Sequence, residues 1–216
     1  MASSSEAVGQ KLMASSSEAV GQKLMASSSE AVGQNKRIAV VGTSGAGKST
    51  LGRSLAAALK IAFVELDAIN WQAGWKDLNT HDPEEFQRRV ATALSGDAWV
   101  SDGNYGAAIG PSVLGRATHL IWLDYERPVV MRRVIWRSLV RSLDRKELWP
   151  GTGNRERFKQ WFTDRDHPIR WAWRTHASRR ARYEALIAKP ENAHLKVLRL
   201  RTPREAADLA VRLAAP

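Results

Sequence analysis

The segment Gly42-Thr43-Ser44-Gly45-Ala46-Gly47-Lys48-Ser49-Thr50 constrains this chain more than any other feature, because its first eight residues match the pattern G-x-x-x-x-G-K-[ST] at every position. An apolar run, 37–41, precedes them and a helical pattern, 48–60, follows, which is the context that this motif requires. Glycines allow backbone N–H groups to curl around phosphate oxygens, and the following helix directs its positive end at the same anion. We therefore predict a site for ATP and Mg²⁺, in which Lys48 reaches the β- and γ-phosphates and the Ser49 hydroxyl binds the metal.

The rest of the chain alternates between short apolar runs and helical patterns. A parallel sheet covered by helices on both faces is typical of this alternation. Asp82-Pro83 and the capping box that starts at Thr202 predict two helix starts. We predict an α/β fold, a three-layer P-loop NTPase like the nucleoside monophosphate kinases, with five parallel strands at 37–41, 61–66, 98–102, 119–124 and 195–200.

A magnesium site next to this motif needs a carboxylate at the end of a strand. Asp102 ends the third strand and Asp124 ends the fourth, which is the more apolar of the two. In P-loop kinases with strand order 2-3-1-4-5, the third strand lies beside the strand that carries the phosphate loop. Because ligands gather at the carboxyl ends of such strands, we predict Asp102 as the metal ligand and keep Asp124 as the alternative.

Asp67 follows the second strand and faces the same crevice in this arrangement. Its carboxylate would contact an acceptor substrate or activate the hydroxyl of that substrate. Capping of a turn or helix is the alternative interpretation of an aspartate at such a position.

Three spaced motifs make the chain recognisable from Lys36 to its C-terminus: the phosphate loop, the segment Leu66–Trp75, and Asp102-Gly103-Asn104-Tyr105. Together they resemble the bacterial DNA topology modulation protein group of adenylate-kinase-like P-loop proteins. In nucleoside monophosphate kinases the third strand ends in Asp-Gly-Phe-Pro-Arg. Here Asn104 and Tyr105 depart from that pattern and the arginine is absent, so the resemblance implies an acceptor other than AMP, contacted by Asp67, Asn104 and Tyr105.

The resemblance also implies a lid rich in arginine. In adenylate kinases a Leu-Asp pair and a helix that begins with proline precede two arginines four residues apart, and Arg133 and Arg137 stand at the matching offsets here. Residues four apart share one helix face, so both side chains could enter the crevice and neutralise charge during transfer. Surface exposure is the alternative for each of them, and the weaker lid candidates are Arg165, Arg170 and Arg174. Arg133 is also a candidate to stack on adenine, and Arg201 to Pro203 to line the base pocket.

The positive charge is concentrated in the same region. The whole chain carries a net charge of +11. Residues 127–190 hold 17 basic and six acidic residues together with five of the nine tryptophans, so this segment alone accounts for the excess. Arginines interleaved with aromatic residues can stack on bases and pair with phosphates. A lid for small phosphates is our first interpretation of 127–190, and a nucleic-acid surface and an inert solvated surface are the alternatives.

The first 34 residues have a different character. Met1–Leu12 recurs identically as Met13–Leu24, and a third copy begins at Met25, a candidate for the original start. Such a Ser/Ala/Gly/Gln-rich repeat lacks the large apolar side chains that could offset its ordering entropy. We therefore expect residues 1–34 to be a disordered leader, and residues 35–216 to form one P-loop kinase-like domain.

Composition excludes several classes of protein and site. Zero cysteines rule out disulfides, thiolate zinc sites and a cysteine nucleophile, and this suits the cytoplasm. No apolar run approaches the roughly 18 residues of a membrane span, and the start lacks the pattern of a secretory signal, so we expect no membrane partner. The histidines show no metal-binding spacing, and the sequence indicates no oligomeric state.

The function that we predict is transfer of the γ-phosphoryl group from Mg·ATP to a small hydroxyl or phosphate acceptor. Lys48 and Arg137 would stabilise charge, and positioning and electrostatics would supply most of the catalysis. A nucleic-acid-binding NTPase is the second hypothesis. A binding module gated by nucleotide, without transferase activity, is the third.

Overall fold

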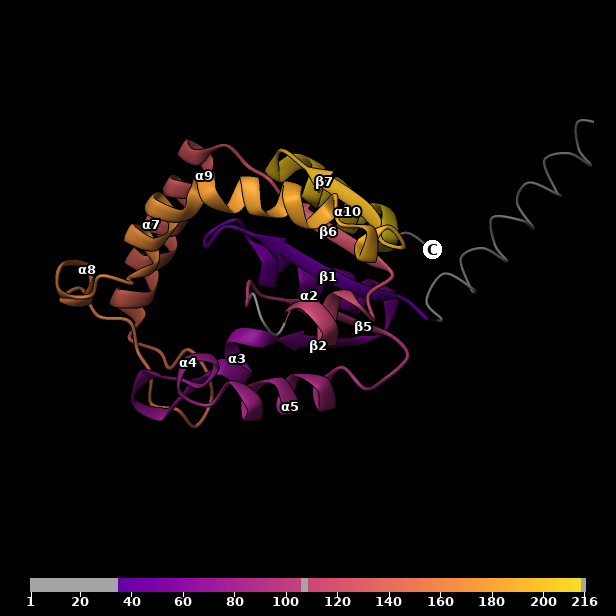
Figure 1. Cartoon of the computed structure of the whole chain (residues 1–216). Coiled ribbons are helices and arrows are strands. Elements are labelled where there is room, and N and C mark those ends of the chain that lie inside the picture. The colour runs from indigo at the N-terminus through magenta and orange to yellow at the C-terminus, as the bar shows by residue number, and fades with distance from the viewer. Residues whose placement is uncertain (1–34, 106–108, 215–216) are drawn as a thin grey trace, which may run out of the picture. The chain divides into compact units, whose positions relative to one another are not determined.

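The computed structural model describes residues 35–105 and 109–214, so the expectation about the leader, 1–34, lies outside the described residues. Five strands form the main sheet: β1 (Arg37–Gly42), β2 (Ala62–Glu65), β5 (Trp99–Asp102), β6 (His119–Leu123) and β7 (Lys196–Leu200). They lie in the order β2-β5-β1-β6-β7, and every neighbouring pair is parallel. In chain order of these five strands this is 2-3-1-4-5, so the predicted topology is confirmed (Figure 1).

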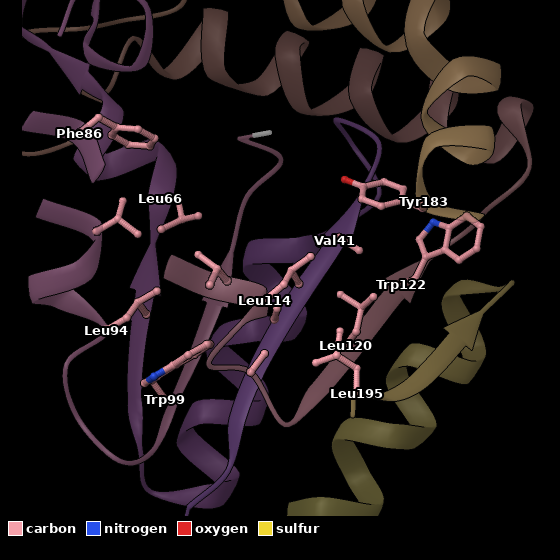
Figure 2. Packing of buried hydrophobic residues seen from close by; sticks show 14 of the residues in the cluster. Val41, Leu66, Phe86, Leu94, Trp99, Leu114, Leu120, Trp122, Tyr183 and Leu195 are labelled. Atoms are coloured by element: carbon pink, nitrogen blue, oxygen red, sulfur yellow. The ribbon is translucent and has the colours of Figure 1, made fainter. Parts of the chain in front are cut away.

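Helices cover both faces of the sheet because the strand side chains alternate between two apolar cores. Val41, Leu120 and Trp122 point into one core, and their chain neighbours Val40, Ile121 and Leu123 point into the other. The first core lies against α5 (Pro83–Ala93) and the short η2 (Ile109–Leu114), with Tyr183 at its edge (Figure 2). The second lies against α2 (Lys48–Leu59) and α10 (Pro203–Ala214). The three-layer α/β class is therefore confirmed.

Two helix starts follow the predicted capping chemistry. The Asp82 side chain accepts a hydrogen bond from the Glu85 N–H at 3.1 Å, and Pro83 occupies the first turn of α5. The Thr202 hydroxyl accepts from the Glu205 N–H at 3.2 Å, ahead of α10. Each side chain satisfies a backbone donor that the helix leaves without a partner.

The basic segment folds as helices joined by a long connection. α7 (Arg127–Asp144) and α9 (Pro168–Ile187) pack on one another, and the single-turn helix α8 (Gln160–Thr163) lies between them in the sequence. A short 3₁₀ turn, η3 (Pro190–Asn192), leads from α9 towards β7. In residues 35–105 and 109–214, no helix combines the length and the apolar character needed to cross a membrane.

The structure differs from the expectation after β2. The predicted strand stops at Glu65, and the chain continues as α3 (Leu66–Asn70), because Leu66 turns into the core beneath Gly103. Asp67 therefore lies in a helical turn instead of at a strand end. A small antiparallel hairpin follows, formed by β3 (Trp71–Gln72), the turn η1 (Ala73–Trp75) and β4 (Lys76–Asp77), with α4 (Leu78–His81) after it.

Candidate phosphate and acceptor site

The phosphate loop packs directly against α7. Gly45 and Gly47 have φ angles of +88° and +97°, which side chains rarely adopt. A Cβ atom on Gly45 would lie 2.6 Å from the Val134 Cβ, and one on Gly47 would lie 2.8 Å from a terminal nitrogen of Arg133. Glycine is therefore needed for backbone conformation and for close approach, and the guanidinium of Arg133 lies over the loop.

Lys48 begins α2 and folds back towards the loop. Its Nζ donates to the carbonyl oxygen of Thr43 at 3.4 Å. Burial lowers the pKa of Lys48, and the nearby carboxylates of Asp67 and Asp102 oppose that shift. Gly47 caps α2 without a side-chain hydrogen bond, so the first N–H groups of the helix face the loop together with the ammonium. This arrangement suits an oligophosphate.

The remaining residues of the motif take different positions. Thr43 and Ala46 are buried, Gly42 ends β1, Ser44 and Ser49 are half-buried, and Thr50 is exposed on the first turn of α2. The motif thus combines buried residues that fix the loop with hydroxyls that remain accessible.

Asp102 lies beside the phosphate loop because β5 pairs with β1, with Asp102 opposite Val40. Its side chain is buried, and its Oδ1 has no hydrogen-bond partner among the described residues. Burial raises the pKa of Asp102 to about 6, while the Ser49 hydroxyl and the Lys48 ammonium pull it down. A buried carboxylate oxygen without a partner, next to a hydroxyl, fits an oxygen-ligated cation such as Mg²⁺.

The protein supplies only part of such a coordination sphere. Within residues 35–105 and 109–214, no group of three or more His, Asp or Glu side chains could enclose a metal. Mg²⁺ usually takes one or two protein ligands and completes its octahedron with phosphate oxygens and water. Ser49 and Asp102 are therefore the pair expected for a metal that arrives with the nucleotide.

Asp124, the alternative metal ligand, is engaged elsewhere. Its Oδ1 accepts from Arg180 at 2.7 Å, and its Oδ2 accepts from Arg199 at 2.6 Å. These two ion pairs join β6 to α9 and β7, and they occupy both carboxylate oxygens. The geometry favours Asp102 for the metal and gives Asp124 a role in stability.

Replacing Asp124 by asparagine is therefore expected to destabilise the fold and to leave nucleotide binding intact. Loss of a buried charge that pairs with two arginines costs up to about 3 kcal/mol here, because both arginines are partly exposed. Urea unfolding measures the first effect and titration with a fluorescent ATP analogue the second. A loss of Mg²⁺-dependent nucleotide binding in Asp124→Asn, without a loss of stability, would identify Asp124 as the metal ligand.

Asp67 and Tyr105 form a hydrogen-bonded pair, and the Asp67 carboxylate lies near enough to Lys48 to affect its pKa. The Tyr105 hydroxyl donates a hydrogen bond to Asp67 Oδ1, and the Tyr105 ring packs edge-on against Phe86 at a centroid distance of 4.9 Å. Burial and the Asp67 carboxylate raise the pKa of Tyr105 well above its usual value, so the phenol stays protonated. This hydrogen bond restrains the orientation of the Asp67 carboxylate.

The Asn104 side chain binds the backbone of Gly42, the first residue of the phosphate loop. Its Nδ2 donates to the Gly42 carbonyl at 2.7 Å, and its Oδ1 accepts from the Gly42 N–H at 3.4 Å and from the Tyr183 hydroxyl. The amide is thus engaged by β1 and α9. These contacts favour a positioning role for Asn104 over the direct contact with an acceptor that the sequence suggested.

Three arginines surround the loop from the helical side. Arg137 approaches Ser44, with 3.4 Å between Nη2 and the hydroxyl oxygen, and its Nε is buried without a partner in the described structure. Burial lowers the pKa of Arg137 to about 10. Arg133 lies against Gly47, as described above, and Arg179 of α9 lies close enough to Lys48 to lower the pKa of that ammonium.

Sequence reasoning missed Arg179 and Tyr183. Arg179 donates to the Thr175 hydroxyl at 3.1 Å and lies over the Trp171 ring, with 5.6 Å between Cζ and the ring centroid. Nothing in the sequence separates Arg179 from the other basic residues of 127–190. Only the packing of α9 beside the end of β1 distinguishes it.

The three weaker lid candidates lie together at a separate cavity. Arg165, Arg170 and Arg174 line a cavity of about 560 Å³ between α7 and α9, together with Met131, Ile169 and Trp173. None of these lining residues belongs to the phosphate loop. Arg201 and Thr202 connect β7 to α10, which begins at Pro203, and the contact of these three residues with the base stays a prediction.

Comparisons with known proteins point to one group of kinases. A family model described as shikimate kinase matches residues 44–95. The shikimate kinases of Nitrobacter winogradskyi and Mycobacterium leprae are each 36% identical to this chain, over 110 and 125 residues. These matches cover 46% and 51% of the chain, and the chain spans only 51% and 62% of the length of those relatives.

Solved structures agree on the fold. The shikimate kinase from Acinetobacter baumannii in complex with shikimate superposes with a TM-score of 0.52 and 22% identity, over 86% of this chain and 94% of that one. The shikimate kinase from Bacteroides thetaiotaomicron gives a TM-score of 0.50 and 18% identity, over 82% and 96% of the two chains. The chain therefore has the fold of P-loop kinases, whereas the narrower likeness to DNA topology modulation proteins gains no support from these comparisons.

Proposed function

We propose that this protein is a kinase that binds Mg·ATP at Gly42–Thr50 and transfers the γ-phosphoryl group to a hydroxyl group of a small molecule. One observation carries the proposal: Lys48, Asp102 and the Asp67–Tyr105 pair converge at the carboxyl ends of adjacent strands. The matches to shikimate kinases support a hydroxyl acceptor. Shikimate is accordingly the first acceptor to test.

We assign separate roles in phosphate binding, metal binding and proton transfer to the residues of the site. The loop amides and Lys48 hold the phosphates, and Arg137 adds positive charge near Ser44. Ser49 and Asp102 would hold Mg²⁺, which supplies neutralisation of phosphate charge when it is bound. Asp67, fixed by Tyr105, accepts the proton of the acceptor hydroxyl while that oxygen bonds to the γ-phosphorus and ADP leaves.

A screen with labelled ATP tests this proposal. The protein is incubated with Mg·ATP and a panel of small alcohols, hydroxy acids including shikimate, sugars and nucleotides. Transfer of label to one class of hydroxyl compound, lost in Lys48→Ala, is the expected result. Tight ATP binding without transfer to any member of the panel would instead indicate a binding module gated by nucleotide.

Asp102→Asn is expected to stabilise the protein and to impair its metal-dependent activity. Folding raises the pKa of the Asp102 carboxyl from its usual value to about 6. The free energy of unfolding of the wild type therefore falls as the pH rises through the interval between these two values. At pH 7 the free energy of unfolding of Asp102→Asn should therefore exceed that of the wild type by roughly 1–3 kcal/mol, and this difference should disappear below about pH 4. Activity of the wild type should rise as Asp102 ionises near pH 6, since a cation binds the carboxylate form.

Thermal unfolding at pH 4 and pH 7, with Mg²⁺ titrations of activity, measures both effects for Asp102→Asn. The Mg²⁺ concentration for half-maximal activity should rise at least tenfold. A variant that is less stable than wild type at pH 7, with unchanged Mg²⁺ dependence, would show that Asp102 is an ordinary core residue.

A nucleic-acid-binding NTPase remains the second candidate function, and the outer cavity between α7 and α9 favours it. Arginines and the exposed Trp173 line this cavity, and Arg127 lies over the Trp173 ring at 5.0 Å. Binding of a labelled single-stranded oligonucleotide should then weaken steeply with salt and stimulate ATP hydrolysis. Charge reversal at Arg170 and Arg174 should abolish oligonucleotide binding and the stimulation of ATP hydrolysis. If the wild type binds no oligonucleotide at low salt, this candidate function is excluded.

A further inference from the structure

The connection between α7 and α8 contains a segment, residues 148–156, which we call the strap. Two of its polar side chains, Asn154 and Glu156, are only 2% and 3% exposed. Burial of an amide and a carboxylate in a loop is costly unless both are fully bonded. Their partners lie in two different parts of the fold, so the strap is a connection between those parts.

Asn154 bonds to the hairpin that follows Asp67. Its Nδ2 donates to the Gln72 carbonyl at 2.9 Å, and its Oδ1 accepts from the Trp75 N–H at 3.0 Å. One side chain thereby binds both ends of the turn η1, from about 80 residues further along the chain. Figure 1 shows the segment between α7 and α8 descending to the region of α3 and α4.

Three half-buried tryptophans reinforce this connection. Trp149 of the strap stacks on Trp71, with 6.3 Å between ring centroids and 20° between planes. Trp75 stands edge-on to both, at 6.0 Å from Trp149 and 5.8 Å from Trp71. Stacked and edge-on aromatic pairs stabilise a fold beyond the effect of the apolar area that they bury. Trp71 directly follows α3, which carries Asp67.

Glu156 attaches the other end of the strap to the arginine-bearing helices. Its Oε1 accepts from His167 Nε2 at 3.0 Å, and its Oε2 lies 3.8 Å from Arg141 of α7. His167 Nδ1 accepts from the Ile169 N–H, so the ring proton is on the nitrogen that faces Glu156. The carboxylate also lies near enough to Arg137 to offset part of the burial of that guanidinium.

We propose that Asn154 and Glu156 are positioning residues, which fix the acceptor-side group Asp67 relative to Arg137 and so set the efficiency of transfer to the acceptor. The inference rests on the proposed function. The physical reason is that a transfer site assembled from two separate segments needs a defined distance between them, and a misplacement of about 1 Å can cost up to 10²-fold in rate.

Asn154→Asp is the sharpest test of this proposal. The substitution keeps the size of the side chain and one acceptor oxygen for Trp75, but it places a carboxylate oxygen against the Gln72 carbonyl. Asn192→Asp is the matched control, because Asn192 is also buried and also donates to a backbone carbonyl, that of Leu186, at 2.8 Å. Asn192 lies in η3, which carries none of the site residues.

Two kinds of readout separate positioning from mere folding. Hydrogen exchange at the Trp75 amide and the circular dichroism of the stacked indoles report the connection itself. Kinetics of transfer to the acceptor that the screen identifies report its consequence. In Asn154→Asp, protection at Trp75 should be lost and kcat/KM for the acceptor should fall at least tenfold, while the Kd of a fluorescent ATP analogue changes less than threefold.

Each outcome bears on the proposal. Asn192→Asp should lose comparable thermal stability with unchanged transfer kinetics, and if it reproduces the kinetic defect the role of Asn154 is only structural. Undiminished transfer in Asn154→Asp, despite lost protection at Trp75, overturns the positioning role alone. A wild type that transfers no phosphate overturns the proposed function and, with it, this inference.

A milder variant covers the case in which Asn154→Asp does not fold. Trp149→Phe leaves the hydrogen bonds of Asn154 in place and removes only the stacked indole pair. It should lower kcat/KM for the acceptor by a few-fold, again with ATP binding unchanged. An acceptor kcat/KM equal to that of the wild type would contradict the proposal.

Discussion

Replacing Lys48 by alanine is expected to lower phosphoryl transfer by about 10²–10³-fold, the usual effect of removing one preorganised group that stabilises developing charge. Among the described residues, the Thr43 carbonyl is the one hydrogen-bond acceptor of the ammonium, and burial lowers the pKa of Lys48. A bound oligophosphate would replace this weak contact with several charge-assisted bonds. Single-turnover transfer from labelled ATP measures the loss.

The stability of Lys48→Ala separates this explanation from unfolding. Because burial disfavours the ammonium, its removal should leave the melting temperature unchanged or raise it. Lys189→Ala is the control, since Lys189 is exposed and pairs with Glu191, far from the phosphate loop in the sequence. Transfer by Lys48→Ala at the wild-type rate would show that the loop does not bind the reacting phosphates.

The sequence predicted the phosphate loop and a parallel sheet because both depend on local patterns, whereas the strand order was taken from P-loop kinases. A glycine-rich turn between a strand and a helix has few physical alternatives, and five apolar runs separated by helical patterns fit a parallel sheet. The choice between Asp102 and Asp124 needed one topological fact, the pairing of β5 with β1. The ion pairs of Asp124 with Arg180 and Arg199 come from β7 and α9, so no local pattern could show them.

The acceptor side was predicted less well, for a physical reason. The hairpin and the strap depend on contacts between segments about 80 residues apart, and Asp67 contacts Tyr105 38 residues further along the chain. Asn154 is one polar residue in a glycine-rich connection, and a pattern search has no reason to select it. Tryptophans 71, 75 and 149 similarly become a cluster only when the chain is folded.

The basic segment shows how the fold divides a charge that composition gives only as a sum. Arg133, Arg137 and Arg179 face the phosphate loop, Arg180 neutralises Asp124, and Arg141 lies near Glu156. The remaining arginines include those that line the outer cavity. A lid for small phosphates therefore accounts for part of the excess charge, and the outer surface carries the part on which the second candidate function depends.

Arg137→Ala should show the largest loss of all, about 10³-fold or more in kcat, the range known for an arginine that neutralises the transferring phosphoryl group. Its guanidinium is enclosed, its Nε has no partner in the described structure, and burial lowers its pKa to about 10. The carboxylates of Glu156 and Asp67 offset only part of the cost of burying this guanidinium. It therefore stabilises little in the resting protein, and we expect its benefit to come from an anion that arrives with the substrate.

Three measurements distinguish this role of Arg137 from a structural one. Arg137→Ala should match or exceed the wild-type melting temperature and bind a fluorescent ATP analogue within about fivefold, because the effect belongs to the transition state. Arg137→Lys should recover only a small part of kcat, since an ammonium cannot form the planar, two-pronged contact of a guanidinium. Arg132→Ala, on the exposed side of α7, is the control and should keep the kcat of the wild type. A loss in Arg137→Ala that appears in KM for ATP, with kcat unchanged, would assign this arginine to ground-state binding and leave Lys48 as the group that stabilises the transfer.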